Sequence, residues 1–234
     1  MMPAAPALGR DPWIGDLFAP EVRTASSPPV DCEEELFPEE RALVASAVAP
    51  RRREFATGRA CARRLLAQLG VPDAPLLRRA DRSPRWPAGL CGSISHCEDL
   101  CVVAVARREV ARALGVDVEP AEPLEPELWP RLCTARELAW LEGRAPAERG
   151  RLVRLLFSAK ESVYKCVRSA GGPELGFHEV EIELPPGAGR FRAAWKAAAG
   201  RALDSGSAEG AFAFRGRWLF TGAALERGLR ELPA

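Results

Sequence analysis

The spacing of hydrophobic residues alternates along the chain between the period of a helix and that of a strand. Over residues 50–69, apolar residues recur on one helical face, arginines occupy the rest, and Gly70 follows as a C-terminal stop. Residues 38–49 are predicted as a preceding helix with a proline near its start. The same spacing returns over residues 136–143 and 151–168, which we also expect to be helical.

Short apolar or alternating runs separated by turn residues predict strands. They fall at residues 92–95, 100–106, 114–119, 180–184, 190–195, 211–214 and 218–223. This order of elements predicts an α+β fold made of two similar-sized α+β halves. We expect an N-terminal extension (1–30), an N-terminal half (31–112) and a C-terminal half (113–234).

Composition narrows the class of protein. With 234 residues, of which 47% are hydrophobic and 28% charged, the chain can bury a substantial core. It has no apolar stretch long enough to span a bilayer and no secretion signal at its start, so we expect a soluble cytoplasmic protein without membrane contact. The seven cysteines are scattered without a C-x-x-C pair, which favours reduced thiols. A net charge of +1 gives no general attraction to nucleic acid.

Charge is nevertheless distributed unevenly along this nearly neutral chain. Residues 51–85 contain ten arginines against three acidic residues. Lysine occurs three times in the whole chain, and Lys160 and Lys165 lie in one nine-residue stretch. Because an ammonium and a planar guanidinium are not interchangeable at phosphates, these two lysines suggest a specific geometric need, with chance clustering as the alternative.

Two acidic motifs could carry chemistry. Asp117 and Glu119 are two residues apart on a predicted strand, so their side chains project from the same face. Glu161 and Lys165 share one face of a predicted helix at i, i+4 spacing. Each motif alone could be ordinary, a solvated strand end or a surface ion pair. Together, three carboxylates and a lysine suit Mg²⁺ bound to a phosphoester, because Mg²⁺ prefers oxygen ligands and often shares substrate phosphate.

Several separated motifs give the chain a family resemblance. They are GVDVE (115–119), FSAKESVYK (157–165), RRREF (51–55) with Gly58 and Arg59, WPAG (86–89), GSISH (92–96) and LGF (175–177). In order and spacing they are similar to the motifs of 4'-phosphopantetheinyl transferases, and most resemble those of the enterobactin-type bacterial branch. The resemblance covers roughly residues 39–184.

The resemblance implies a fold, a reaction and partners. The expected fold is pseudo-twofold, with the site in the cleft between the halves. The expected reaction moves the 4'-phosphopantetheine group of coenzyme A to a serine of an apo acyl or peptidyl carrier protein, requires Mg²⁺ and releases 3',5'-ADP. We expect a monomer. Residues 166–174 depart from the apolar and aromatic run that relatives often carry, which leaves the choice of carrier protein and pathway open.

Site residues are carried over from the resemblance by their positions in the motifs. It implies that Asp117, Glu119 and Glu161 coordinate magnesium, and that Lys165 contacts the pyrophosphate of coenzyme A. Glu161, or a water that it orients, would be the base for the acceptor serine. The residues expected around the 3'-phosphate and adenosine are Arg51, Arg59, Arg78 and His96, with Ser95 as a further phosphate contact. Lys160 points away from Glu161 at about 100° per residue, so we expect only a supporting role.

Two other functions remain as alternatives. One is a magnesium-dependent nuclease or phosphodiesterase, because D…E-x-K clusters also serve phosphodiester cleavage. In this chain, however, the second acid and the lysine are four apart on a helix, and no general basic charge accompanies them. The other is a non-catalytic module that binds coenzyme A, which would not need three acids and Lys165.

Overall fold

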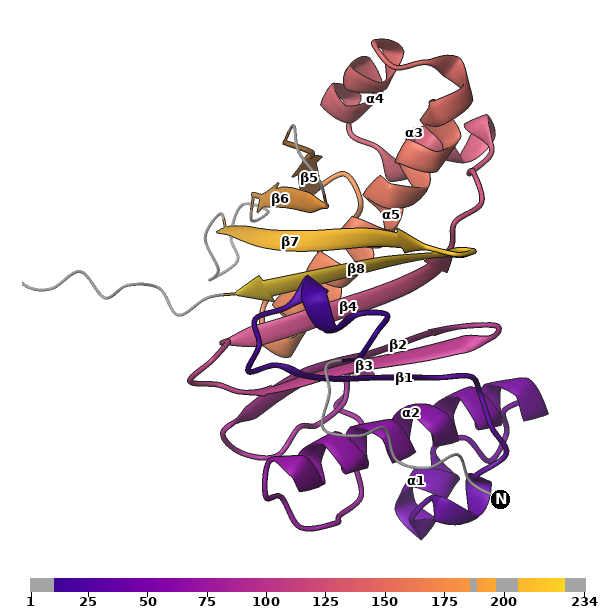
Figure 1. The fold of residues 1–234 in the computed structure, drawn as a ribbon, viewed down its shortest axis with the longest axis vertical. Helices are drawn as coiled ribbons and strands as arrows, with labels where there is room; N and C mark the ends of the chain where they lie inside the picture. Colours follow the sequence, from indigo (N-terminus) through magenta and orange to yellow (C-terminus); the bar gives the residue numbers. More distant parts are fainter. Residues whose placement is uncertain (1–10, 186–188, 197–205, 226–234) are drawn as a thin grey trace, which may run out of the picture.

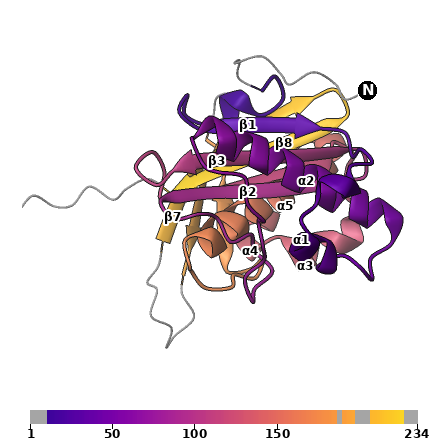
Figure 2. The same ribbon diagram turned by 90° about the horizontal axis from the view of Figure 1, so that it is seen from below.

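The computed structural model describes residues 11–185, 189–196 and 206–225, and within them two antiparallel sheets are each covered by one long helix (Figure 1). The first sheet has the order β1-β3-β2 and consists of β1 (Arg23–Ser27), β2 (Leu90–Cys97) and β3 (Leu100–Arg107). The helix α2 (Ala49–Gln68) lies over these three strands (Figure 2). The expected apolar face is buried, but residues 55–62 are buried on all sides, including Arg59.

The second sheet has the order β4-β8-β7-β6-β5, with every neighbouring pair antiparallel. Its strands are β4 (Ala113–Pro120), β5 (Val180–Glu183), β6 (Arg190–Trp195), β7 (Gly206–Arg215) and β8 (Trp218–Leu225). The helix α5 (Pro146–Ser169) packs chiefly against β4 and β8. The expected α+β fold is therefore confirmed, and the predicted strands lie within these observed ones, except that 180–184 runs one residue beyond the end of β5.

The two sheets meet where β2 packs beside β4. The backbone N–H of Val116 in β4 donates to Ser93 Oγ in β2, 3.1 Å away. One hydrophobic cluster also takes buried residues from both sheets, among them Val102 of β3, Val118 of β4 and Phe220 of β8. Because a single core is shared, side chains from both halves can face one another across this junction.

Part of the expected N-terminal extension, residues 1–30, packs onto the two halves: residues 14–22 contribute side chains to this shared core and residues 23–27 form a strand of the first sheet. A short 3₁₀ helix, η1 (Gly15–Leu17), is followed by β1, which pairs with β3. Ile14 and Phe18 are buried in the shared cluster. The strand escaped prediction because its sequence, RTASS, has no apolar run, which is typical of a polar edge strand.

The predicted helix at 38–49 is also shorter in the structure. Helix α1 spans only Pro38–Ala42, and turns follow it. Val48 is extended, with φ −66° and ψ 154°, because it is the N-cap residue of α2, which begins anew at Ala49 with Pro50 in its first turn. The remaining short elements are η2 (Glu33–Glu35), η3 (Pro126–Leu128), α3 (Trp129–Leu132) and α4 (Ala135–Glu142).

Two further expectations concern membranes and thiols. Across the described residues, no helix combines the length and the apolar character needed to cross a membrane. All seven cysteines are free, and six of them are buried, as expected for reduced thiols that serve as small hydrophobic groups.

Candidate active site

The centre of the site lies where strand β4 runs directly against helix α5. A Cβ atom on Gly115 would lie 1.8 Å from the carbonyl oxygen of Ser162 and 2.7 Å from the backbone nitrogen of Cys166. Only glycine permits this approach. The motif therefore needs its glycine so that the carboxylate of Asp117, two residues along the strand, can reach side chains of the helix.

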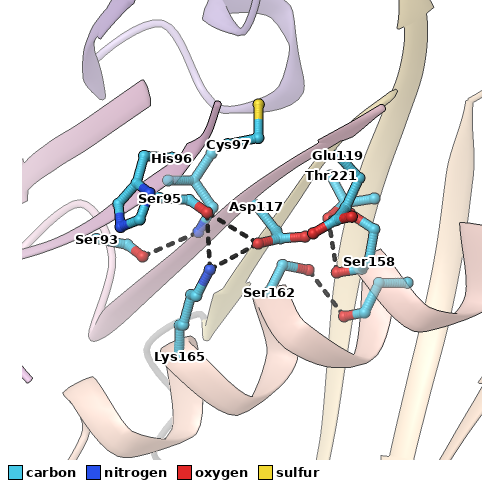
Figure 3. Close-up of polar contacts among 12 residues, drawn as sticks. Ser93, Ser95, His96, Cys97, Asp117, Glu119, Ser158, Ser162, Lys165 and Thr221 are labelled. Carbon is cyan, nitrogen blue, oxygen red and sulfur yellow. Dashed lines mark hydrogen bonds and ion pairs between the residues drawn. The ribbon is translucent and has the colours of Figure 1, made fainter. Parts of the chain in front are cut away.

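Asp117 is the hub of a hydrogen-bond network that joins β2, β4 and α5. Its side chain is buried, with Lys165 and Ser95 on one side and Ser158 on the other (Figure 3). Asp117 Oδ1 accepts from Lys165 Nζ at 2.6 Å and from Ser95 Oγ at 2.9 Å, while Oδ2 accepts from Ser158 Oγ at 2.8 Å. Lys165 also donates to Ser95 Oγ at 2.9 Å. These contacts bring residues from both halves to one point.

Glu119 and Glu161, two of the three candidate metal ligands, lie in surroundings that disfavour the charged form of a carboxylate. Burial, followed by the negative charge of Asp117, raises the pKa of Glu119 to about 7, although Arg154 opposes this with an ion pair of 2.9 Å. Burial also raises the pKa of Glu161, with Lys165 opposing and Asp117 adding to the shift. A cation bound beside them would relieve this destabilisation.

The three carboxylates fit magnesium by donor chemistry, because all of their ligand atoms are oxygens. Within the described ranges, no three side chains of ligand type converge closely enough to enclose an ion. Asp117 is engaged by Lys165 and Glu119 by Arg154. Asp117, Glu119 and Glu161 could thus hold the ion if the two cationic side chains move aside.

A second part of the site is a cavity of about 340 Å³ between α2, the 77–85 loop and β2, which we call the arginine pocket. Its charged and titratable lining residues are Arg51, Arg59, Arg78, Arg82, His96 and, as the one acid among the described lining residues, Glu54. Such a cluster of guanidinium groups suits phosphate, which they can bind in a bidentate manner. The pocket therefore offers an anion site inside a chain with almost no net charge.

Phe55 organises two of these arginines. The Arg59 guanidinium lies 4.3 Å from the centroid of the Phe55 ring and that of Arg78 lies 4.9 Å from it. Arg59 is buried and its Nε donates to the Leu76 carbonyl oxygen at 2.8 Å. Burial lowers the pKa of Arg59 to about 10, so it is still a cation at neutral pH.

His96 lies at the edge of the arginine pocket as a neutral side chain. Burial, with the nearby charge of Arg51 adding to it, lowers the pKa of His96 to about 4. Its Nδ1 lies 3.1 Å from Glu54 Oε2, and Arg51 Nη1 contacts its Nε2. The tautomer that satisfies both contacts carries its proton on Nδ1 and accepts from Arg51 at Nε2.

Two further cavities lie between the arginine pocket and Glu161, and each shares lining residues with its neighbour. A cavity of about 210 Å³, which we call the bridging pocket, shares Arg82, Pro84 and Ile94 with the arginine pocket and also borders Lys165. A third cavity of about 130 Å³ shares Tyr164 with the bridging pocket and is lined by Glu161. An elongated ligand could therefore lie along one path from the arginines past Lys165 to Glu161.

The residues expected from the sequence form three groups in the structure. Arg51, Arg59, Arg78 and His96 share the arginine pocket, whereas Ser95 does not line it and instead joins the Asp117 network. Lys165 forms an ion pair with Asp117 of β4, although Glu161, four residues earlier on the same helix, is its neighbour in helical spacing. The sequence reasoning gave no role to Phe55, Arg82, Arg154 and Ser158. Phe55 ends the RRREF motif, Arg82 belongs to the arginine-rich run and Ser158 to the helix motif, but nothing local distinguished their roles.

Lys160 has a role that its position did not reveal. It is among the most deeply buried side chains and forms an ion pair of 2.6 Å with the buried Glu137 of α4. Its Nζ also donates to the carbonyl oxygens of Leu132 and Phe177, each at 2.8 Å. Lys160 therefore ties α5 to α3, to α4 and to the segment before β5, away from the Asp117 network.

Comparisons with known proteins agree with this geometry. The 4'-phosphopantetheinyl transferase N-terminal domain matches residues 39–106, and the 4'-phosphopantetheinyl transferase superfamily matches residues 113–218. The chain is 44% identical over 189 residues to 4'-phosphopantetheinyl transferase Svp of Streptomyces mobaraensis, covering 78% of this chain and 73% of that protein. It is 37% identical over 200 residues to 4'-phosphopantetheinyl transferase PptT of Mycobacterium tuberculosis, covering 82% of each. Enterobactin synthase component D of Salmonella typhi is 37% identical over 123 residues, 52% of this chain and 50% of that protein.

Proposed function

The chain belongs to the 4'-phosphopantetheinyl transferases, enzymes that move phosphopantetheine from coenzyme A to carrier proteins, and we propose that it does so with Mg²⁺ and releases 3',5'-ADP. The observation that carries this proposal is the series of three neighbouring cavities, with shared lining residues, that runs from the arginine pocket past Lys165 to Glu161. Coenzyme A has a charged end, a pyrophosphate and a long neutral arm, so it matches a path that begins with cations and passes a lysine.

Coenzyme A would lie with its 3'-phosphate and adenosine in the arginine pocket. Arg51, Arg59 and Arg78 supply the cationic groups there, and the neutral His96 can donate through Nδ1 if it releases Glu54. The pyrophosphate would follow at the bridging pocket, which Lys165 and Arg168 of α5 both line. The Ser95 hydroxyl, which accepts from Lys165 and donates to Asp117, would have to turn its proton from Asp117 to the pyrophosphate to contact it.

The chemical step needs a base, a positioned phosphate and charge neutralisation. Glu161 would take the proton of the acceptor serine as the serine Oγ attacks the β-phosphorus and the bond from phosphorus to the 3',5'-ADP oxygen breaks. A raised pKa suits Glu161 to this role, because a base works best when its pKa approaches the working pH. Lys165 would donate to a pyrophosphate oxygen and hold it in line. Magnesium, held by Asp117, Glu119 and Glu161, would supply further charge neutralisation at the pyrophosphate.

The two alternative functions fit the geometry less well. A nuclease would need an open basic surface for a nucleic-acid backbone, whereas the arginines here line a pocket of about 340 Å³. A binding module would have no use for the carboxylates gathered around Lys165. We therefore place a transferase first.

One assay separates the three functions. The protein is incubated with coenzyme A, Mg²⁺ and an apo carrier protein, and the carrier is examined by intact mass spectrometry. A transferase adds one phosphopantetheine group to the carrier and releases 3',5'-ADP in equal amount. A phosphodiesterase would release nucleotide without the carrier. A binding module would bind coenzyme A and leave the masses of both the carrier and coenzyme A unchanged. Loss of the added mass when Mg²⁺ is chelated would support the metal requirement.

Partner and location are further parts of the proposal. Relatives named enterobactin synthase component D make a peptidyl carrier of a siderophore pathway the first partner to test. Seven free thiols favour the reducing cytoplasm. We infer a monomer, because residues of one chain supply the arginine pocket, the Asp117 network and Glu161; size-exclusion chromatography with light scattering tests this.

A further inference from the structure

An ion pair crosses from the second half of the molecule to the loop that carries part of the arginine pocket. Arg168, one residue before the end of α5, donates through Nη2 to Asp81 Oδ2 at 2.7 Å. Its Nη1 donates to the Gly172 carbonyl oxygen at 2.8 Å, which fixes the guanidinium from the other side. The two side chains are 23% and 22% exposed, so the pair is largely shielded from solvent.

Asp81 in turn organises its own loop. It accepts from the backbone N–H of Ser83 at 3.0 Å and from Ser83 Oγ at 2.6 Å. Between them, Arg82 has φ +65°, the only left-handed residue other than glycine in the described part of the chain. A side chain in that region persists only when the surrounding contacts hold it, and the Asp81 contacts on either side of Arg82 do so.

The 77–85 loop, held in this way, places two arginine side chains in the arginine pocket. Backbone hydrogen bonds from Arg79 to Ser83 and from Arg85 to Leu77, each 2.8 Å, close residues 77–85 into a hairpin-like turn. Arg78 and Arg82 of this turn line the arginine pocket, and Arg82 also lines the bridging pocket together with Asp81 and Arg168. The position of two cations in the first half therefore depends on a contact made by the second half.

We propose that Arg168 is a positioning residue for coenzyme A, acting through Asp81 to hold the 77–85 loop so that Arg78 and Arg82 face the ligand. This inference rests on the proposed function, since it takes coenzyme A as the occupant of the arginine pocket. Arg168 does not line the arginine pocket but does border the bridging pocket, so the double-mutant cycle with Asp81 separates an effect through the loop from a direct contact with the pyrophosphate.

The test removes the charge of Arg168 and follows binding, turnover and loop motion separately. In Arg168→Gln, the Kd and KM for coenzyme A should rise about fivefold, the loss of about 1 kcal/mol given by one partly exposed ion pair. The kcat should stay within about twofold, because Asp117, Glu161 and Lys165 are untouched. Hydrogen exchange at the amide of Ser83 should become faster. Arg136→Gln is the matched control, because it breaks an exposed ion pair of 2.7 Å with Glu181 and should change none of these.

A double-mutant cycle shows whether the effect passes through Asp81. Asp81→Asn keeps an oxygen that can accept from Ser83 but removes the charge, so it should reproduce the fivefold loss, and the double variant should lose no more than either single one. If Arg168→Gln fails to fold, Asp81→Asn on its own carries the same measurement.

Three outcomes would overturn the proposal. The first is unchanged coenzyme A affinity in Arg168→Gln, whether or not Ser83 exchanges faster. The second is a fall in kcat at constant Kd, and the third is full additivity in the cycle. The failure of the proposed function looks different, because the wild-type protein itself would then not bind coenzyme A.

Discussion

The arginine pocket and the Asp117 network treat charge in opposite ways. The pocket, built on the first half, gathers four arginines with one acid and keeps His96 neutral. The second half places Asp117 against Lys165, and burial, with the charge of Asp117 adding to it, raises the pKa of Glu119 and Glu161. On the proposed function, a chain with a net charge of +1 would hold an anion at the first place and a cation at the second. The contrast teaches that ligand affinity and turnover should be separable by mutation.

The largest effect should be a loss of stability on substitution of Lys160. This lysine pairs with Glu137 and belongs to neither the arginine pocket nor the Asp117 network. In Lys160→Met the buried Glu137 loses its ionic partner, and breaking such a pair costs about 3–5 kcal/mol of unfolding free energy. Urea denaturation measures this. Lys196→Met, at an exposed lysine, is the control and should change the unfolding free energy by less than about 0.5 kcal/mol. A loss below about 1 kcal/mol in Lys160→Met would mean that the pair is not structural.

Glu161→Gln should give the largest effect on turnover. Glutamine keeps the length of the side chain but cannot act as a base and is a poorer metal ligand, so kcat should fall at least about 10²-fold. The Mg²⁺ concentration needed for half-maximal activity should rise. Steady-state kinetics with an apo carrier protein measures both. Normal turnover at low Mg²⁺ would remove α5 from the active site.

Arg78→Ala should weaken the binding of coenzyme A and leave turnover nearly unchanged. Loss of a charge-assisted contact costs about 1.5–3 kcal/mol, so the Kd for coenzyme A should rise about tenfold or more, with little change in kcat. Dephospho-coenzyme A lacks the 3'-phosphate, and its Kd should rise less. Arg79→Ala is a matched control, because this neighbouring arginine does not line the arginine pocket. Equal weakening of both ligands would place Arg78 away from the 3'-phosphate.

The smallest effect concerns the neutral histidine of the arginine pocket. The pKa of His96 falls from its ordinary value of 6.5 to about 4 in the folded protein, so between these values the unfolded chain binds more protons. The contribution of His96 to stability should therefore decrease as the pH falls from 6.5 to 4, by about 1–2 kcal/mol, whereas Glu119, with its raised pKa, contributes in the opposite direction. Urea denaturation across this range gives the unfolding free energy at each pH, and its slope against pH should be less positive in His96→Gln than in the wild type. His178→Gln, at the exposed second histidine, should keep the wild-type slope.

Much of the fold followed from local patterns, and its exceptions have physical causes. The face of α2 and the strands β2, β3 and β4 are regular, so periodicity predicted them. The polar strand β1 could not be predicted, because it has no apolar run of its own. Its pairing with β3 places it in the sheet.

The candidate site shows the same division. Motif positions gave the carboxylates, Lys165 and most of the arginine pocket. Helical spacing alone pairs Lys165 with Glu161, but the close packing of β4 on α5 at Gly115 brings Asp117 nearer. The burial of Lys160 depends on Glu137, 23 residues earlier, and no local pattern connects the two.

The central claim is that the first half holds coenzyme A while the second half carries out the transfer. It is tested most directly by measuring the Kd for coenzyme A and the kcat of Glu161→Gln and Arg78→Ala side by side, by calorimetry and by carrier modification. The account predicts a crossed pattern: Glu161→Gln loses turnover with its Kd within about threefold of wild type, and Arg78→Ala loses affinity with its kcat retained. If both variants lost affinity and turnover in equal proportion, the claim would be contradicted.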